Sequence, residues 1–258
     1  MIGDDLALIS DAAHEAGEIA MRYFRKDPDV WYKSGASPVS EADIAVNTFL
    51  HTKLRQARPD YGWLSEETVD DSSRLEGKAV FVIDPIDGTR AFVNGDDVWC
   101  VSIAVVLDGR TIAGVLACPA REEFFASGLD GSAIRNNQLI QVARPDNRVQ
   151  IAAPENVLRR LPEEFMRGRE RARHIPSLAY RIAMVADGRL AATLIRPHSH
   201  DWDLAAADLI LHNAGGAIVD TDGAPLLYNR NEVTHGLLVA APTGFLPAIH
   251  EALSGIDL

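Results

Sequence analysis

Apolar residues in the first quarter of the chain recur every three or four positions, which is the period of an amphipathic helix. This spacing predicts a helix over residues 6–25, with an apolar stripe made of Leu6, Ile9, Ala13, Ala16, Ala20 and Phe24. A second helix is predicted over residues 41–56, because Ser40 in the N-cap position and Asp43 three residues later form a capping-box pattern. The chain therefore opens with two helices that each bury one face.

Mostly apolar runs replace the helical period from residue 79 onward. Turn signals such as Asp108-Gly109 separate these runs, which predict strands at residues 79–84, 99–107, 111–118 and 122–127. After a break at Arg144-Pro145-Asp146-Asn147, strand-like apolar runs alternate with segments that have the helical period. We expect strands at residues 149–154, 190–195 and 236–241, helices at 177–188 and 204–216, and a final helix near the C-terminus.

This alternation of helices with strands predicts a layered α/β (α+β) architecture. Because the pattern changes at the break, we expect two lobes, residues 1–148 and 149–258. The first lobe would carry most of the candidate metal ligands, and the second would carry Asp203 and residues on the substrate side. A binding site is expected where strands end between the lobes.

The composition adds the class of protein to this outline. The 258 residues are 47% hydrophobic and 24% charged, a balance typical of a globular protein with a large core. No apolar run reaches the roughly 20 residues of a membrane span, and the acidic N-terminus lacks the basic region of a signal peptide. Cys100 and Cys118 both lie in apolar runs, so we expect core thiols and a cytoplasmic location.

The net charge of −12 restricts the partners. An acidic chain without a basic run repels nucleic acid polymers, so none is expected as a partner. A small phosphorylated metabolite would be repelled as well, unless cations lie between its phosphate and the carboxylates.

The segment "FVIDPIDGT" offers such a place for cations. Asp84 should emerge at the end of a strand, Pro85 should form a turn, and Asp87 should return toward Asp84. Two close carboxylates need a cation between them, and Mg²⁺ prefers oxygen ligands, to which the Ile86 carbonyl would add a third. By itself, the segment is equally typical of a surface Asp-Gly turn. The spaced acids of an EF-hand are missing.

The residues that follow suit a phosphate. Gly88 and Thr89 should open a short helix over residues 90–93, and the free amide groups of a helix N-terminus bind phosphate. Thr89 would add a hydroxyl beside the metal site.

Two further acidic segments become candidate ligands for the same metal site. Glu66 and Glu67 follow an apolar pair and would ordinarily be solvated, but a buried Glu66 would complete the metal site. Farther along, either Asp201 or Asp203 should cap the helix that follows. Two acids around Trp202 exceed what capping needs, so Trp202 would pack inward while Asp203 points into the cleft.

The histidines near Asp203 suggest a second possible kind of metal site. His198 and His200 suggest zinc ligation, but the segment already offers oxygen ligands. His200 is equally suited to orienting a neighbouring acid.

Taken together, these segments resemble the inositol monophosphatase superfamily of Mg²⁺-dependent, lithium-sensitive phosphomonoesterases. The resemblance covers nearly the whole chain, and its motifs are Pro38–Asp43, Glu66-Glu67, Asp84–Thr89 and Trp202–Gly216. It implies an αβαβα sandwich and two or three Mg²⁺ ions per site. A homodimer is one possible assembly, and the sequence does not reveal the oligomeric state.

The resemblance also implies which residues bind the ions. Glu66, Asp84 and the Ile86 carbonyl would bind one metal. Asp84, Asp87 and Asp203 would bind another, with Asp84 bridging the two.

Roles in catalysis follow from the same resemblance. Thr89, supported by Asp43, and Glu66 would position and deprotonate the attacking water. The amides of Gly88 and Thr89 would hold the phosphate.

Four residues bear on the substrate. Arg196 stands where inositol-phosphate enzymes carry an acid, and an arginine suits a second phosphate, although a surface ion pair is an equal alternative. Arg181 stands where 3'(2'),5'-bisphosphate nucleotidases carry a lysine. Arg90 matches their basic residue, whereas Ala91 replaces their glutamate.

We therefore expect a phosphatase of the 3'(2'),5'-bisphosphate nucleotidase branch, acting on adenosine 3',5'-bisphosphate or its sulfated relative. An inositol-1-monophosphatase is the first alternative, ahead of a histidinol-phosphate or fructose-bisphosphate phosphatase. A homologue that binds phosphate or metal without catalysis is the alternative from another class.

Overall fold

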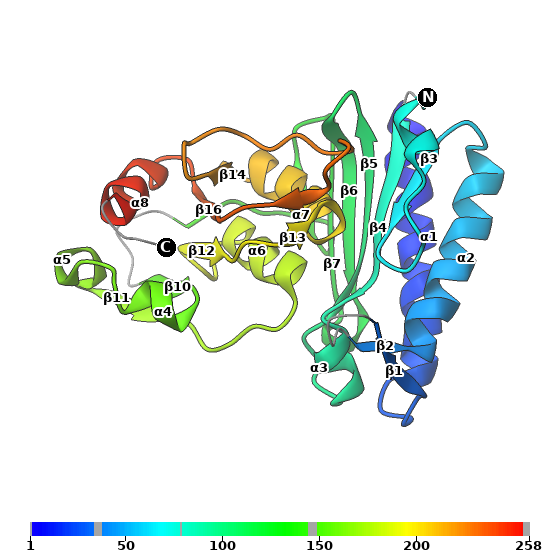
Figure 1. Ribbon diagram of the computed structural model, residues 1–258, viewed down its shortest axis with the longest axis horizontal. Helices are drawn as coiled ribbons and strands as arrows, with labels where there is room; N and C mark the ends of the chain where they lie inside the picture. The colour runs from blue at the N-terminus through cyan, green and yellow to red at the C-terminus, as the bar shows by residue number, and fades with distance from the viewer. Residues whose placement is uncertain (1, 34–37, 78, 144–148, 255–258) are drawn as a thin grey trace.

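Five layers, in the order α-β-α-β-α, make up the molecule (Figure 1). The computed structural model describes residues 2–33, 38–77, 79–143 and 149–254. The outermost layer is a pair of helices, α1 (Ile2–Tyr23) and α2 (Glu41–Ala57). This arrangement confirms the layered α+β sandwich expected from the sequence.

The helix pair covers one face of a seven-stranded sheet. The strands, in spatial order, are β3 (Gly62–Ser65), β4 (Ala79–Asp87), β5 (Cys100–Leu107), β6 (Arg110–Cys118), β7 (Glu123–Gly128), β8 (Ala133–Arg135) and β9 (Gln138–Leu139). Only the β3–β4 pair is parallel among these neighbours.

Both faces of this sheet are buried, which explains why its strands are apolar at successive positions. Phe81 and Ile83 of β4 belong to the hydrophobic cluster under α1 and α2. Val80 and Val82 of the same strand belong to the cluster shared with the central helices. The central layer consists of α6 (Leu178–Ala186) and α7 (Asp201–Asn213).

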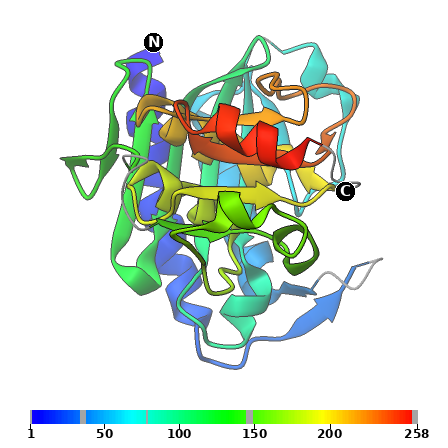
Figure 2. The same ribbon diagram turned by 90° about the vertical axis from the view of Figure 1, so that its left-hand side faces the viewer.

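A five-stranded sheet covers the other side of the central helices. Its strands, in spatial order, are β11 (Arg169–Arg171), β10 (Val149–Ala152), β12 (Ala192–Ile195), β16 (Leu238–Pro242) and β14 (Gly216–Asp220). The helix α8 (Leu246–Leu253) forms the last layer, and Figure 2 shows α8 in red in front of this sheet.

Short elements connect the layers. They are the paired strands β1 (Val30–Tyr32) and β2 (Pro38–Ser40), the paired strands β13 (Ser199–His200) and β15 (Thr234–His235), the helices α3 (Thr89–Val93), α4 (Glu155–Leu158) and α5 (Glu163–Met166), and the 3-10 turns Ser72–Leu75 and Pro119–Arg121.

Most predicted elements are present, and their ends differ from the prediction by a few residues. The capping box is confirmed, since the Ser40 amide donates to Asp43 Oδ2 at 2.8 Å. The two thiols, Cys100 and Cys118, are buried and unpaired, as predicted. The sequence analysis did not predict the short strands β1, β2, β3, β8, β9, β11, β13, β14 and β15.

The prediction that a strand ends at Asp84 and turns at Pro85 is wrong. β4 continues to Asp87, with Asp84 opposite Ser102 and Asp87 opposite Cys100. Three steps along β4 therefore face two steps along β5, which is a β-bulge. The bulge absorbs Pro85, which cannot donate to the ladder.

The predicted start of the helix at residue 204 is also wrong, and neither Asp201 nor Asp203 is the N-cap residue, although Asp203 does cap the helix as the acid of a capping box. α7 begins at Asp201, and His200 is its N-cap residue. The Asp201 carboxylate instead accepts from the Asn229 amide at 2.6 Å and lies 2.7 Å from His235 Nε2. Asp203 accepts from the His200 amide at 2.7 Å. Tertiary partners of Asp201, which the local pattern cannot show, extend the helix by one turn.

The expected lobe boundary, residues 144–148, lies outside the described residues. The seven-stranded sheet uses residues 62–139, and the five-stranded sheet uses residues 149–242. One hydrophobic cluster nevertheless joins both parts, since it contains Leu116, Ile182 and Leu204. The division into two lobes stays a prediction.

No helix in the described part of the chain is both long and apolar enough to cross a bilayer.

Candidate active site

The predicted acidic residues meet in one cavity of about 400 Å³ at the carboxyl ends of β3 and β4. Because these two strands are parallel neighbours, Glu66 after β3 comes beside the end of β4, and its amide donates to the Ile83 carbonyl at 3.2 Å. The predicted site residues that line this cavity are Glu66, Asp84, Ile86, Asp87, Gly88, Thr89 and Asp203.

Three carboxylates lie close enough to share an ion. One oxygen each from Asp84, Asp87 and Asp203 falls within 4.8 Å of the others. Asp84 and Asp87 come from the bulge of β4, and Asp203 comes from the first turn of α7. Within the described residues, no other set of three acidic, histidine or cysteine side chains is placed in this way.

Burial and mutual repulsion disfavour the charged forms of these carboxylates. Burial raises the pKa of Asp84 well above its ordinary value, and repulsion from Glu66 and Asp87 raises it further. Burial, followed by repulsion from Asp203, raises the pKa of Asp87 to about 6. Burial raises the pKa of Glu66 to about 7, against the opposing effect of Lys33. A cation among these carboxylates would stabilise their charged forms.

The donor set fits Mg²⁺. Asp84, Asp87 and Asp203 offer only oxygen atoms, which hard divalent cations prefer. His200 stacks on Trp202 with ring centroids 4.5 Å apart, and its Nδ1 lies 3.7 Å from Asp203 Oδ2. That position matches the orienting role that was the alternative to zinc ligation.

Asp87 is held in place by α6. Its Oδ2 accepts from the Ser177 hydroxyl at 2.5 Å and from the Ala179 amide at 2.6 Å, and its Oδ1 accepts from the Leu178 amide at 3.2 Å. Ser177 is the N-cap of α6, so one carboxylate joins the metal site to the central layer. The sequence analysis missed this role of Ser177, although a serine after a proline and before an apolar helix is a recognisable N-cap signal.

Glu66 and Glu67 share a lysine that the sequence analysis also missed. The Lys33 ammonium donates to Glu67 Oε1 at 2.6 Å and to the Glu66 carbonyl at 3.1 Å. It also lies 3.5 Å from Glu66 Oε1. The Glu67 side chain is only 3% exposed, so the expectation of a solvated pair is wrong for Glu67.

A glycine is required at the start of α3. Gly88 has φ +96°, a conformation that residues with a Cβ rarely adopt. A Cβ there would also lie 3.1 Å from the Val98 carbonyl and 3.3 Å from Ser177 Cβ. The predicted short helix over residues 90–93 is present as α3, which begins one residue earlier at Thr89.

Asp43 performs two tasks with its two oxygens. Oδ2 closes the capping box with Ser40, and Oδ1 lies 3.1 Å from Thr89 Oγ1. The same hydroxyl lies 3.0 Å from the Ile86 carbonyl. The single hydroxyl proton therefore has two acceptors, and donation to Asp43 frees the Ile86 carbonyl for another partner.

We predict that Asp43→Asn lowers kcat at least about 10-fold, a loss typical of removing a residue that orients a catalytic group. If the asparagine oxygen keeps the bond to Ser40, its NH₂ group faces Thr89 and reverses the hydroxyl. The melting temperature should change little, because the whole cap is worth only about 1 kcal/mol. The exposed acid Glu41 of the same helical turn provides the control, Glu41→Gln. Equal kcat in both variants would contradict a role in catalysis.

Arg181 and Arg196 do not lie among the acidic residues. They line an adjoining cavity, also of about 400 Å³, which shares His174 and Asp203 with the acidic one. Three further basic side chains border this second cavity: Arg171, His174 and His198. Its one acid besides Asp203 is Glu155, which pairs with Arg159 and Arg171.

Arg181 is the most enclosed of these basic groups. Burial lowers the pKa of its guanidinium, opposed by the attraction of Asp87. Its Nε is buried without a hydrogen-bond partner among the residues described. The sequence analysis did not identify Arg171 or His174, because only tertiary structure brings them to this cavity.

An αβαβα sandwich with a carboxylate cluster between its sheets defines the class of inositol monophosphatase-like proteins. The chain belongs to the inositol monophosphatase family, whose model matches residues 5–255.

Individual relatives agree with this membership. The chain is 29% identical to the 3'(2'),5'-bisphosphate nucleotidase CysQ of Aggregatibacter actinomycetemcomitans, over 87% of each chain. It is 30% identical to the inositol-1-monophosphatase of Mesorhizobium japonicum, over 90% of this chain and 91% of the relative. A solved structure of the extragenic suppressor protein suhB of Bartonella henselae matches with a TM-score of 0.85 and 25% identity, over 98% of this chain and 100% of the other.

Two relatives named for different phosphate esters thus match the chain equally well. Family membership supports a phosphatase, and overall similarity does not separate the substrates.

Proposed function

We propose that the chain is a Mg²⁺-dependent phosphomonoester hydrolase that acts on a 3'(2'),5'-bisphosphate nucleotide. The observation that carries the choice of substrate is the basic cavity beside the acidic one. A substrate with one phosphate needs only the acidic cavity. A bisphosphate also uses the second cavity, where the buried guanidinium of Arg181 lacks a hydrogen-bond partner for its Nε among the described side chains.

In this proposal, the side chains that hold Mg²⁺ are Asp84, Asp87 and Asp203, with Glu66 and the Ile86 carbonyl completing the ligand set. When bound, Mg²⁺ supplies positive charge for phosphoryl transfer and lowers the pKa of water toward neutrality. Ser177 and the start of α6 keep Asp87 aimed at the cavity. Arg181 and Arg196 of the second cavity offset the charge of the other phosphate.

The chain's own groups then orient the attacking water. Asp43 accepts a hydrogen bond from the Thr89 hydroxyl, and this orientation turns an oxygen lone pair of Thr89 toward the cavity. That lone pair accepts a hydrogen bond from water, while the Glu66 carboxylate in the same cavity accepts its second proton. Gly88, at the opening of α3, brings backbone close to the phosphate.

A comparison of kcat/KM for adenosine 3',5'-bisphosphate, inositol 1-phosphate, histidinol phosphate and fructose 1,6-bisphosphate tests the proposal. We expect the nucleotide to be preferred. Arg181→Met should lower kcat/KM for the nucleotide by about 10- to 100-fold, the value of one charge-assisted hydrogen bond, with less effect on inositol 1-phosphate. The exposed Arg173 lies outside the cavity, so Arg173→Met is the matched control.

Each alternative has its own outcome. Faster hydrolysis of inositol 1-phosphate by the wild-type protein would place the chain in the inositol-phosphatase branch. No hydrolysis of any ester, together with tight Mg²⁺ binding, would indicate a homologue that binds metal without catalysis. Lithium sensitivity, which rests on family membership, and a cytoplasmic location, which rests on the two free core thiols, are part of the same proposal.

A further inference from the structure

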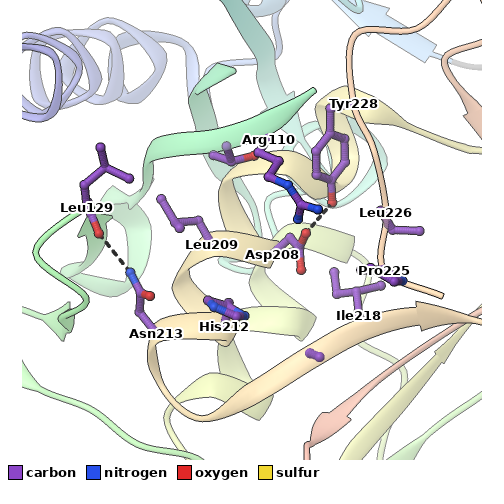
Figure 3. A pocket seen from close by; sticks show the side chains of 13 residues that line it. Arg110, Leu129, Asp208, Leu209, His212, Asn213, Ile218, Pro225, Leu226 and Tyr228 are labelled. Carbon is purple, nitrogen blue, oxygen red and sulfur yellow. Dashed lines mark hydrogen bonds between the residues drawn. The ribbon is translucent and has the colours of Figure 1, made fainter. Parts of the chain in front are cut away.

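A third cavity, of about 310 Å³, lies at the end of α7 opposite Asp203 (Figure 3). The start of β6, the end of β7, the C-terminal half of α7, β14 and residues 225–228 surround it. The acidic and basic cavities lie at the other end of the same helix, so this cavity is separate from the candidate active site. Its volume is at the lower end of the roughly 300–1,000 Å³ of small-molecule sites.

An acid lies in the wall of this cavity. Asp208 is half-buried, and its Oδ2 accepts from the Tyr228 hydroxyl at 2.8 Å. Tyr228 is only 2% exposed, which fixes the position of Asp208. Burial raises the pKa of Asp208 to about 6. A carboxylate in such surroundings is stabilised by a cationic ligand group.

The remaining wall is largely apolar. Leu209, Ile218 and Leu226 form it, and Figure 3 shows Leu209 and Ile218 on either side of Asp208. Thr111 also lines the cavity, and its hydroxyl oxygen is buried without a hydrogen-bond partner in the described part of the chain. A ligand for these walls has an aliphatic body.

Two basic side chains stand at the rim. Arg110 and His212 are exposed, and Figure 3 shows the Arg110 side chain extending toward Tyr228 and Asp208. His212 follows Asp208 by one turn of α7. These groups suit an anionic group on the solvent side of the ligand.

We propose that this cavity binds a small zwitterion, namely an α-amino acid with an aliphatic side chain. The ammonium group contacts Asp208, the side chain packs on Leu209 and Leu226, and the carboxylate faces Arg110 and His212.

The contacts of Tyr228 connect this site to Asp203. Its ring lies 5.9 Å from that of His235, and His235 Nε2 lies 2.7 Å from Asp201 Oδ1. The amide of Asn229, next to Tyr228, donates to Asp201 Oδ2 at 2.6 Å. A ligand that displaces Tyr228 would therefore also disturb the contacts of Asp201 in the first turn of α7. Resting on the proposed function, we expect the zwitterion to change the affinity for Mg²⁺ several-fold.

Calorimetry of the full chain tests the binding step without any phosphatase activity. The probes are L-leucine, isopentylamine, which lacks the carboxylate, and 4-methylpentanoate, which lacks the ammonium group. We expect saturable binding of leucine, tighter than that of either probe by at least about 10-fold, the effect of one lost ionic contact. A leucine dissociation constant above about 10 mM, or equal binding of 4-methylpentanoate, would overturn the proposal.

Variants locate the ligand in this cavity. Asp208→Asn should weaken leucine binding at least about 10-fold, whereas Asp222→Asn, at an exposed acid outside the cavity, should not. Arg110→Met should weaken leucine binding and leave isopentylamine binding unchanged. Unaltered leucine binding in both cavity variants would refute the site. Titration of Mg²⁺ with and without leucine tests the connection, and equal affinities would overturn that part alone.

Discussion

Replacing Asp84 with asparagine is expected to lower kcat/KM by more than about 100-fold, since even residues that only orient a metal ligand cost 10- to 100-fold. Asp84 is 2% exposed, and one of its oxygens lies within 4.8 Å of an oxygen of Asp87 and an oxygen of Asp203. The variant should also bind Mg²⁺ more weakly in calorimetry. Both effects follow from the loss of one negative charge at the centre of the cluster.

Metal-free stability separates this explanation from misfolding. The substitution removes a buried carboxylate that its neighbours repel, so Asp84→Asn without metal should be at least as stable as the wild type at pH 7.5. The control is Asp60→Asn, at an exposed acid far from the cluster in the sequence and absent from its lining. A fully active Asp84→Asn protein would refute the proposed ligand set.

The metal-free protein is expected to lose on the order of 3 kcal/mol of stability between pH 5 and pH 8. The ordinary pKa values of Glu66 and Asp87 are 4.5 and 3.8, and the folded protein raises them to about 7 and about 6. At a pH between the unfolded and the folded pKa of each group, the folded state binds more protons than the unfolded state. The stabilisation that these two groups contribute is therefore fully present below their unfolded pKa values, and it is lost as the pH rises through their folded pKa values.

Urea unfolding in EDTA at a series of pH values measures this loss. Saturating Mg²⁺ should restore most of the stability above pH 7, because the ion binds the charged carboxylates of the folded state. Asp208 has its pKa raised to about 6 outside the metal site, so a smaller decline should persist with Mg²⁺. Stability without metal that rises from pH 5 to pH 8 would contradict the burial of these acids.

Local spacing in the sequence determined several features of this protein. The apolar period specified α1 and α2. Ser40 and Asp43 specified the capping box at the N-terminus of α2. The segment from Asp84 to Thr89 carried two acids, a carbonyl and a helix start within six residues, so it was a candidate metal and phosphate site before the fold was known. Backbone geometry over a few residues is sufficient for such predictions.

Contacts between distant segments were decided by the tertiary structure alone. Asp203 joins Asp84 and Asp87 because α7 packs against the sheet that carries β4. Ser177 fixes Asp87 because α6 packs against the sheet that carries β4. Arg171 and His174 join Arg181 in one cavity because the second sheet, which carries Arg171, covers the central helices. The bulge at Pro85 and the early start of α7 likewise depend on partners in β5 and in residues 229–235. Sequence spacing reports which side chains a short segment offers, whereas packing of buried faces decides which segments meet.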